Sequence, residues 1–356
     1  MRRFAIIAAI FAASTCYAQT EAPKTAEQVY QNIVQLKGTP ADQLMPAMQF
    51  ISASLGVECS YCHVQGKMDA DDKPAKKTAR SMIAMQMAIN KESFSGRTQV
   101  TCNTCHRGAE HPVSAPAVRE SDNMPSETAA APPAGASTQP SVDDILNHYI
   151  TAVGGADSLK KVTSRDLKGV IMFGGNENPI EVITKAPNRR VSISHTQAGD
   201  SYTAFDGTAG WLGNTGRPAR EMAAAESAAS ALDAEFYLPL RLKEMYPQLR
   251  RGRSEKVNGA DCDLLNGTAP GRPAVRLYFD KQSGLLVRMV RFADTPLGRN
   301  PTQIDYADYR DSGGAKIPYR WTLSRPNGRF TIQVKEALAN VTVDDAKFAK
   351  PAGEVK

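Results

Sequence analysis

Two short words of the same pattern hold four of the six cysteines in this 356-residue sequence. They are GVECSYCHVQGK, residues 56–67, with Cys59, Cys62 and His63, and VTCNTCHRGAE, residues 100–110, with Cys102, Cys105 and His106. Two thiols three positions apart on a helical turn can bond to the two vinyl groups at one edge of a porphyrin, and the next residue then presents an imidazole to the iron. The pattern predicts two covalently bound c-type haems, with the two histidines as proximal iron ligands.

Other uses of paired cysteines fit this sequence less well. Zinc ribbons separate their Cys-x-x-Cys pairs by about 15–20 residues, whereas 39 residues lie between these two pairs. A disulfide framework suits an exported chain, and a thioredoxin-like redox pair occurs once, near a βαβ pattern. None of these uses requires a histidine directly after both pairs, so haem attachment is the preferred interpretation.

Each iron needs a sixth ligand unless that position is left open for a substrate. Methionine is a natural candidate, because its soft thioether favours ferrous iron and raises the potential. Met48 lies 11 residues before Cys59, and Met82 lies 20 residues before Cys102. Methionines on helix stripes also serve as core residues. We predict Met48 and Met82 as distal ligands, and the alternatives are Met45, Met85 and Met87.

Three helices are predicted to position these groups. Their expected bounds are Thr25 to Gly38, Thr39 to Gly56, and Pro74 to Asn90. The first begins with a capping box, and glycines end the first and the second. Pro46 lies inside the second segment, where we expect it to kink the helix or to mark a late start.

The beginning of the chain resembles an export signal. Residues 1–18 combine two arginines, a short apolar run and a small-residue cleavage site after Ala18. Acylation of Cys16, which would make a lipoprotein, is the weaker alternative. No later stretch approaches the roughly 20 apolar residues that a membrane helix needs. We therefore expect a periplasmic protein.

A break in composition divides the remaining sequence. Residues 111–140 are rich in Pro, Ala, Ser and Thr and are predicted to be a linker between a dihaem cytochrome c domain, 19–110, and a domain at 141–356. We expect proteolysis of this linker to release two folded parts. The second domain opens with a helix capped by Ser141, and a helical insertion spans about 221–240. Its alternating segments predict strands: EVITK, RRVSISH, AVRLYFD, LLVRMVRF, YRWTL and FTIQVKEA.

The predicted fold class is α+β with two domains. The first is an all-α multihaem cytochrome c domain, and the second is an antiparallel β half-barrel-like sheet packed with helices. Cys262 lies in a strand-like context and is expected to be a buried, unreactive thiol. We assign no chemistry to His148 or His195, and the sequence contains no nucleophile elbow, P-loop or dinucleotide fingerprint.

The haem words and their flanks resemble the cytochrome c subunit of photosynthetic reaction centres. The resemblance covers about residues 26–110 and rests on MQFISASLGVECSYCHV, ARSMIAMQMAIN and VTCNTCHRG. It implies an axial methionine on the helix before each haem word, at Met48 and in the Arg-x-Met of Arg80–Met82. Reaction-centre members carry four haem words and this chain carries two, so a free-standing dihaem carrier is expected. The region after the linker has no counterpart in this resemblance.

The C-terminal domain resembles, more weakly, the half-barrel of outer-membrane lipoprotein carriers. The segments that carry this resemblance are LYFDKQSGLLVRMVRF and DYRDSGGAKIPYRWTL. It implies a curved sheet around a helix, able to hold an acyl chain in an apolar groove. A docking or spacer module is the favoured alternative for this domain.

These observations together predict an electron carrier without enzymatic activity. Two six-coordinate irons would leave no site for a substrate, and we place a propionate contact at Arg107. Residues 19–120 contain 11 Lys or Arg and 10 Asp or Glu, so four haem propionates would make this surface acidic. A redox partner with a basic docking patch is therefore expected. The two proteins could meet within a membrane-associated electron-transfer complex or outside one. We expect no nucleic acid as a partner. The alternatives are a dihaem peroxidase with one open haem, and a lipid- or lipoprotein-binding protein with an accessory haem domain.

Overall fold

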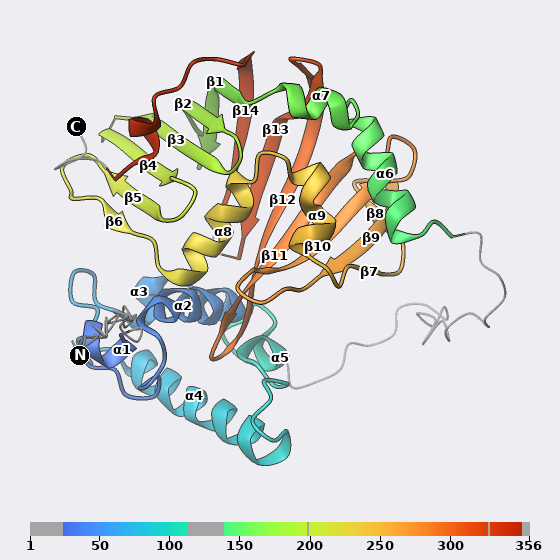
Figure 1. Cartoon of the computed structure of the whole chain (residues 1–356). Helices are drawn as coiled ribbons and strands as arrows, with labels where there is room; N and C mark the ends of the chain where they lie inside the picture. Colours follow the sequence, from blue (N-terminus) through green and yellow to red (C-terminus); the bar gives the residue numbers. More distant parts are fainter. Residues whose placement is uncertain (1–23, 113–138, 198, 327, 351–356) are drawn as a thin grey trace, which may run out of the picture.

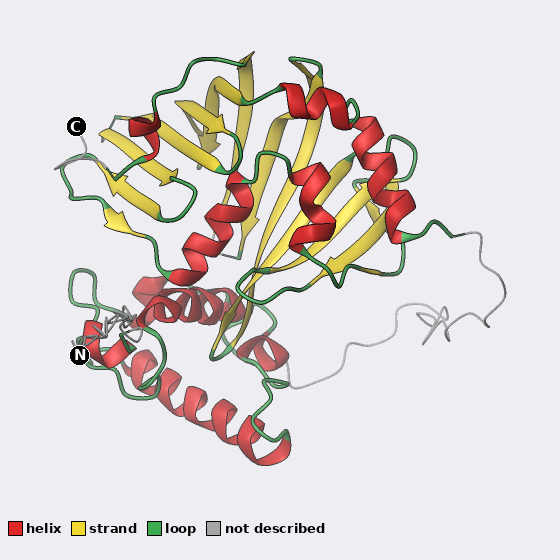
Figure 2. Cartoon of the chain, viewed as in Figure 1, coloured by secondary structure: helices red, strands yellow, loops and turns green. Residues whose placement is uncertain are grey.

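The computed structural model describes residues 24–112, 139–197, 199–326 and 328–350. The fold is α+β, with a large antiparallel open sheet, helices against its concave side, and a helical N-terminal region beside one end of the sheet (Figures 1 and 2). The predicted signal peptide, residues 1–18, and most of the predicted linker lie outside the described residues. The division into domains at 110 and 141 therefore stays a prediction.

The N-terminal region carries five helices within residues 24–112. They are α1 (Ala26–Val29), α2 (Ala41–Leu55), α3 (Cys59–Cys62), α4 (Pro74–Ser93) and α5 (Cys102–His106). The prediction of a helix from Thr25 to Gly38 is wrong beyond Val29. The backbone is extended at Tyr30 and left-handed at Asn32, because the Asn32 side chain bonds to a distant loop, 2.9 Å from Asp71 Oδ1. Asparagine adopts the left-handed conformation more readily than most residues, and a residue in that conformation cannot continue a right-handed helix.

Helix α2 begins and ends close to the predicted residues. Pro40 is its N-cap, and Gly56 closes it in the left-handed conformation. Pro46 lies inside the helix without interrupting it. It lies near the N-terminus, where the missing backbone N–H removes only one hydrogen bond of the ladder. The helix therefore runs unbroken up to the first haem word.

The sheet has 14 strands in one antiparallel path, in the order β6-β5-β4-β3-β2-β1-β14-β13-β12-β11-β10-β9-β7, with β8 paired to β9. The first and last strands of the region are neighbours at its centre. Every strand predicted from the sequence is present. The strands are β1 (Ser164–Phe173), β2 (Asn176–Lys185), β3 (Arg189–Thr196), β4 (Gly199–Phe205), β5 (Gly210–Asn214), β6 (Arg220–Glu221), β7 (Arg250–Arg251), β8 (Glu255–Val257), β9 (Ala260–Gly267), β10 (Ala274–Asp280), β11 (Leu286–Thr295), β12 (Gly298–Ser312), β13 (Ala315–Arg325) and β14 (Gly328–Ala339).

Helices fill the concave side of the sheet (Figure 1). They are α6 (Val142–Ala152), α7 (Ala156–Lys161), α8 (Ala224–Ala234) and α9 (Leu238–Met245), and a short 3-10 helix, η1 (Asp345–Phe348), contacts β3 near the end of the described chain. The predicted cap of α6 is present, with Ser141 Oγ accepting from Asp144 N at 3.1 Å. The main core joins Tyr149, Leu242 and Tyr246 of the helical segments to Leu277 and Met289 of the sheet. Side chains from α6, α8 and α9 thus belong to the main core on this side of the sheet.

The hairpin between β11 and β12 connects the sheet to the N-terminal helices. Leu297, at its turn, is fully buried in a cluster with Leu44, Ala47 and Ile83. Its neighbour Gly298 lies so close to Phe50 that an added Cβ would come within 2.7 Å of that ring. The long hairpin can be followed down to α2 in Figure 1. This contact, which the sequence did not predict, ties the two parts of the chain together.

We expect Leu297→Asp to separate the two parts of a chain cleaved between residues 113 and 138. The buried carboxylate would lack a partner and would replace an apolar contact whose loss alone costs about 2–5 kcal/mol. Contrary to the expectation from the sequence that proteolysis releases two separate parts, the unmutated cleaved chain should elute as one complex in size-exclusion chromatography, because Leu297 is buried among residues of α2 and α4. Leu338→Asp, on a leucine that is 45% exposed in β14, is the matched control and should leave the complex intact. Separation of the unmutated pieces would show that the hairpin contact is too weak to hold them.

Candidate functional site

A cavity of about 480 Å³ brings the first haem word together with its predicted distal ligand. Cys59, Cys62 and His63 line one part of it, and Met48 of α2 lines another. The wall is completed by the segment 29–36, where the predicted helix is absent, and by one face of α4. Its volume lies within the usual range for cofactor pockets, roughly 300–1,000 Å³.

Both histidines have one ring nitrogen bound to a backbone carbonyl. His63 Nδ1 lies 2.7 Å from the carbonyl oxygen of Met68, and His106 Nδ1 lies 3.0 Å from that of Ala109. A carbonyl can only accept, so Nδ1 must carry the hydrogen in each ring. The Nε2 lone pair of each imidazole is then available to a metal, which is the arrangement that orients ligating histidines in proteins.

Two of the four thiols of these words, those of Cys62 and Cys102, are partly buried. All four are free cysteines, as is Cys262. Burial raises the pKa of the Cys62 and Cys102 thiols, which is the opposite of what an activated redox thiolate shows. Within the described parts of the chain, no group of three or more His, Cys, Asp or Glu side chains is placed to hold a metal ion. This geometry favours neither a zinc site nor a catalytic disulfide.

Three methionines line the first cavity, and two of them, Met45 and Met48, lie on α2. Met48 is half-buried beside the apolar cluster of α2, whereas Met45 is 53% exposed, and both line the cavity. Met48 shares the helix face of Leu44 and Ile51, which also line it. We retain Met48 as the proposed ligand and Met45 as its rival.

The second haem word lies against α4. Cys102 Sγ is 3.9 Å from Gln86 Oε1, and Met82 precedes Gln86 by one helical turn, on a neighbouring part of the same face. Met85 is adjacent to Gln86 in sequence and therefore points about 100° away around the helix. The position of Cys102 thus favours Met82 over Met85 as the distal ligand of the second haem.

The two haem words are packed against each other. Gly108, near the end of the second word, donates its N–H to the carbonyl of Ser54 at 2.8 Å. A Cβ on Gly56, the first residue of the first word, would lie 2.2 Å from the carbonyl oxygen of Gly108, so only glycine fits this contact. Tyr61, within the first word, donates to the carboxylate of Glu110, which raises the pKa of Tyr61.

Exposed apolar side chains gather around these words. Among the described residues, twelve large hydrophobic side chains are exposed, and nine of them belong to the N-terminal region. Five of the nine line the cavity: Val29, Tyr30, Val34, Met45 and Met68. Soluble proteins seldom leave apolar groups clustered in this way unless a ligand covers them. The donor set and the apolar walls both fit a haem.

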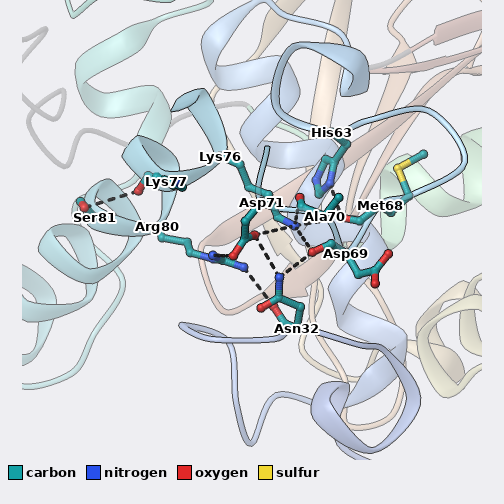
Figure 3. A network of polar contacts seen from close by, with 10 residues as sticks. All are labelled: Asn32, His63, Met68, Asp69, Ala70, Asp71, Lys76, Lys77, Arg80 and Ser81. Carbon is teal, nitrogen blue, oxygen red and sulfur yellow. Dashed lines mark hydrogen bonds and ion pairs between the residues drawn. The ribbon is translucent and has the colours of Figure 1, made fainter. Parts of the chain in front are cut away.

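A polar network beside His63 was not predicted from the sequence (Figure 3). Its members come from three separate segments and are Asn32, Asp71, Lys76 and Arg80, together with the carbonyls of residues 68–70. In the sequence, Lys76 is one of two adjacent lysines, a pattern typical of an exposed helix surface, so nothing there indicated its role. Arg107, for which we predicted a propionate contact, is exposed and left-handed just after α5, and that contact stays a prediction.

The other sequence predictions concern the sheet region. Cys262 is fully buried, and burial raises the pKa of its thiol, as expected for an unreactive cysteine. His195 lies 2.8 Å from Asp200 on the β3–β4 hairpin, a pair that the sequence analysis did not predict. His148 borders a smaller cavity of about 250 Å³ next to Gly284. Neither histidine lies near the haem words.

Sequence comparison connects the N-terminal region to one family. The family model of the photosynthetic reaction centre cytochrome C subunit matches residues 4–168. The subunit of that name from Thermochromatium tepidum is 35% identical over 95 residues, which are 26% of this chain and 23% of the relative. Cytochrome c-554 of Chloroflexus aurantiacus is 34% identical over 92 residues, which cover 23% of this chain and 22% of that protein. The chain thus spans about a quarter of these relatives.

The predicted family resemblance is confirmed, and the match extends further than expected. It passes the linker and reaches residue 168, which includes α6 and α7, so the statement that nothing after the linker has a counterpart is wrong. No helix among the described residues is long and apolar enough to cross a membrane.

Comparison with solved structures finds similarities of low score. A DUF1329 family protein from Desulfovibrio piger has a TM-score of 0.43 and 13% identity, and covers 58% of this chain and 97% of its own. A LolA superfamily protein from Nitrosomonas europaea has a TM-score of 0.39 and 11% identity, and covers 53% and 90%. Similarities of this size carry no conclusion about the fold or the function of the C-terminal domain, so its resemblance to lipoprotein carriers stays a prediction.

Proposed function

We propose that this protein is a periplasmic dihaem cytochrome c that carries single electrons between redox partners. The observation that carries the proposal is the paired arrangement of the histidines. Each follows a Cys-x-x-Cys turn, and each has Nδ1 bound to a carbonyl, so that Nε2 is free to ligate iron. A bound haem supplies reversible one-electron chemistry at its iron.

The residues of the chain have distinct roles in this proposal. Cys59 and Cys62 attach the first haem and Cys102 and Cys105 the second, and His63 and His106 hold the proximal positions. Met48 and Met82 close the distal positions, which excludes exogenous ligands and separates this function from that of a peroxidase. The contact between Gly56 and Gly108 holds the two attachment turns side by side, which suits transfer of an electron from one haem to the other.

The compartment and the partner follow from the same reasoning. The predicted signal at residues 1–18 would export the chain, as maturation of c-type cytochromes outside the cytoplasm requires. With the propionates added, the nearly balanced haem domain would be acidic, so a basic patch on the partner would steer a brief encounter. We propose that the sheet region supports docking, because its hairpin is anchored in the haem domain through Leu297.

We expect the unmutated protein to be closed to external ligands. Because both distal positions would be filled by methionine, the reduced protein at neutral pH should show no spectral change under carbon monoxide and no peroxide turnover. A reductive titration should consume two electrons per chain. Rapid binding of carbon monoxide at one haem, together with peroxide turnover, would reject the carrier in favour of the dihaem peroxidase.

A further inference from the structure

Lys76 holds the loop that orients the first haem histidine. This lysine lies on α4 and is only 8% exposed. Its Nζ donates to three consecutive backbone carbonyls, of Met68 at 3.0 Å, Asp69 at 2.9 Å and Ala70 at 2.8 Å. Three carbonyl acceptors match the three hydrogens of an ammonium group, so the side chain is a cation here. The first of these carbonyls is the one that accepts from His63 Nδ1 (Figure 3).

The rest of the network fixes the lysine and sets the local charge. Asp71 lies 3.2 Å from Lys76 and 2.8 Å from Arg80. These cations and the amide of Asn32 hold the pKa of Asp71 well below its usual range. Asn32 also donates to the Asp69 carbonyl at 2.5 Å. Lys76 and Arg80 thus face the carboxylate of Asp71, and Asp69, which also lines the cavity, adds a second carboxylate.

We propose that Lys76 is a positioning residue that raises the reduction potential of the first haem. The inference rests on the proposed function and concerns only how one of its ligands is tuned. A cation on the Met68 carbonyl makes that oxygen a poorer acceptor, so the His63 ring gains less basicity from its hydrogen bond. A less basic imidazole stabilises ferric iron less. The nearby positive charge also favours the ferrous state, which carries one positive charge fewer.

Among the residues that the structure describes, no lysine is bonded in the same way at the second haem word. His106 bonds to the Ala109 carbonyl at 3.0 Å. Within residues 24–112, no lysine or arginine side chain donates to that oxygen. The two histidines therefore share the same kind of bond, but only the first has a cation behind its acceptor. This difference would give the two haems unequal potentials, with the first one higher.

A propionate contact is the alternative role for this lysine. It is disfavoured because all three ammonium hydrogens are already used by carbonyls and a fourth contact, to Asp71, is made at the same nitrogen. Arg80 differs, since its bonds to Asp71 and to the Asn32 carbonyl use only part of the guanidinium. A propionate that reaches this side of the cavity would meet Arg80 before Lys76.

The test compares three full-length holoprotein variants by potentiometric titration. Lys76→Met keeps the length of the side chain and removes the cation, so the ferric-to-ferrous ratio of the first haem at a fixed ambient potential should rise roughly tenfold, or 59 mV for a one-electron couple. Asp71→Asn removes the opposing charge and should move the same haem in the other direction. Lys77→Met removes the same charge from the exposed neighbouring residue, which lies outside the network. This change should shift the potential of the first haem little. The second haem should not follow any of these changes.

The outcomes separate charge from structure. A purely structural role predicts that Lys76→Met and Asp71→Asn both loosen the loop and move the potential in the same direction, which would overturn the proposal. Equal shifts for Lys76→Met and Lys77→Met would also overturn it. If Lys76→Met fails to fold, the direction of the shift in Asp71→Asn decides alone. Haem content by mass is measured on every variant, and an unmutated protein without haem would reject the proposed function rather than this inference.

Discussion

Replacing Cys59 and Cys62 together with alanine will remove one haem from the protein and leave the other in place. Thioether bonds require the thiols, and the first word has none after this change. The second word lies on α5 and keeps its own thiols and histidine. We expect intact mass spectrometry to show the loss of one haem per chain, and the haem absorbance to fall by about half.

The reciprocal variant and a control complete this experiment. Replacing Cys102 and Cys105 should likewise leave one haem, now on the first word. Cys262→Ser should keep both, because this cysteine is buried in β9 and lies in a different cluster from the haem words. An unmutated protein that carries zinc, or no covalent group at all, would reject the haem interpretation.

Replacing Met48 with alanine will open the distal side of the first haem. The side chain lines the cavity opposite the attachment turn, and alanine leaves no group able to reach the iron. We expect the reduced variant to bind carbon monoxide at one haem, whereas the unmutated protein does not. Met48→His should instead keep the site closed and lower the potential of that haem, because imidazole stabilises ferric iron more than a thioether does.

The rival methionines provide matched controls. Met45→Ala removes a neighbouring methionine that lines the same cavity and should leave carbon monoxide binding unchanged. At the second haem, Met82→Ala should open the site and Met85→Ala should not, since only Met82 shares the face of Gln86. If Met45→Ala or Met85→Ala opens a site in place of the predicted variant, the ligand assignment is wrong and the carrier function remains.

Local patterns were enough to predict the haem words, the fold class and six of the strands that the described residues form. A Cys-x-x-Cys-His word contains its whole geometry within one helical turn, so no distant contact is needed to recognise it. Alternating apolar residues likewise predict a strand from its own sequence, and each strand predicted in this way is present, with β3 and β11 as clear cases. Gly56 could be predicted as the end of α2 because the left-handed cap is a property of that residue.

Long-range contacts decided the rest. The segment after Val29 has a helical pattern, but its Asn32 bonds to Asp71 across the fold and its apolar side chains line the cavity instead. Nothing in the sequence around Leu297 indicates its contact with the N-terminal helices, which is seen only where residues of α2 and α4 surround it. The proposed role of Lys76 could be inferred only from the folded chain, which brings three backbone carbonyls to its ammonium group. Spacing along the sequence predicts which atoms would bind the haems, whereas only tertiary structure brings together the charges that we propose set the potential of the first haem.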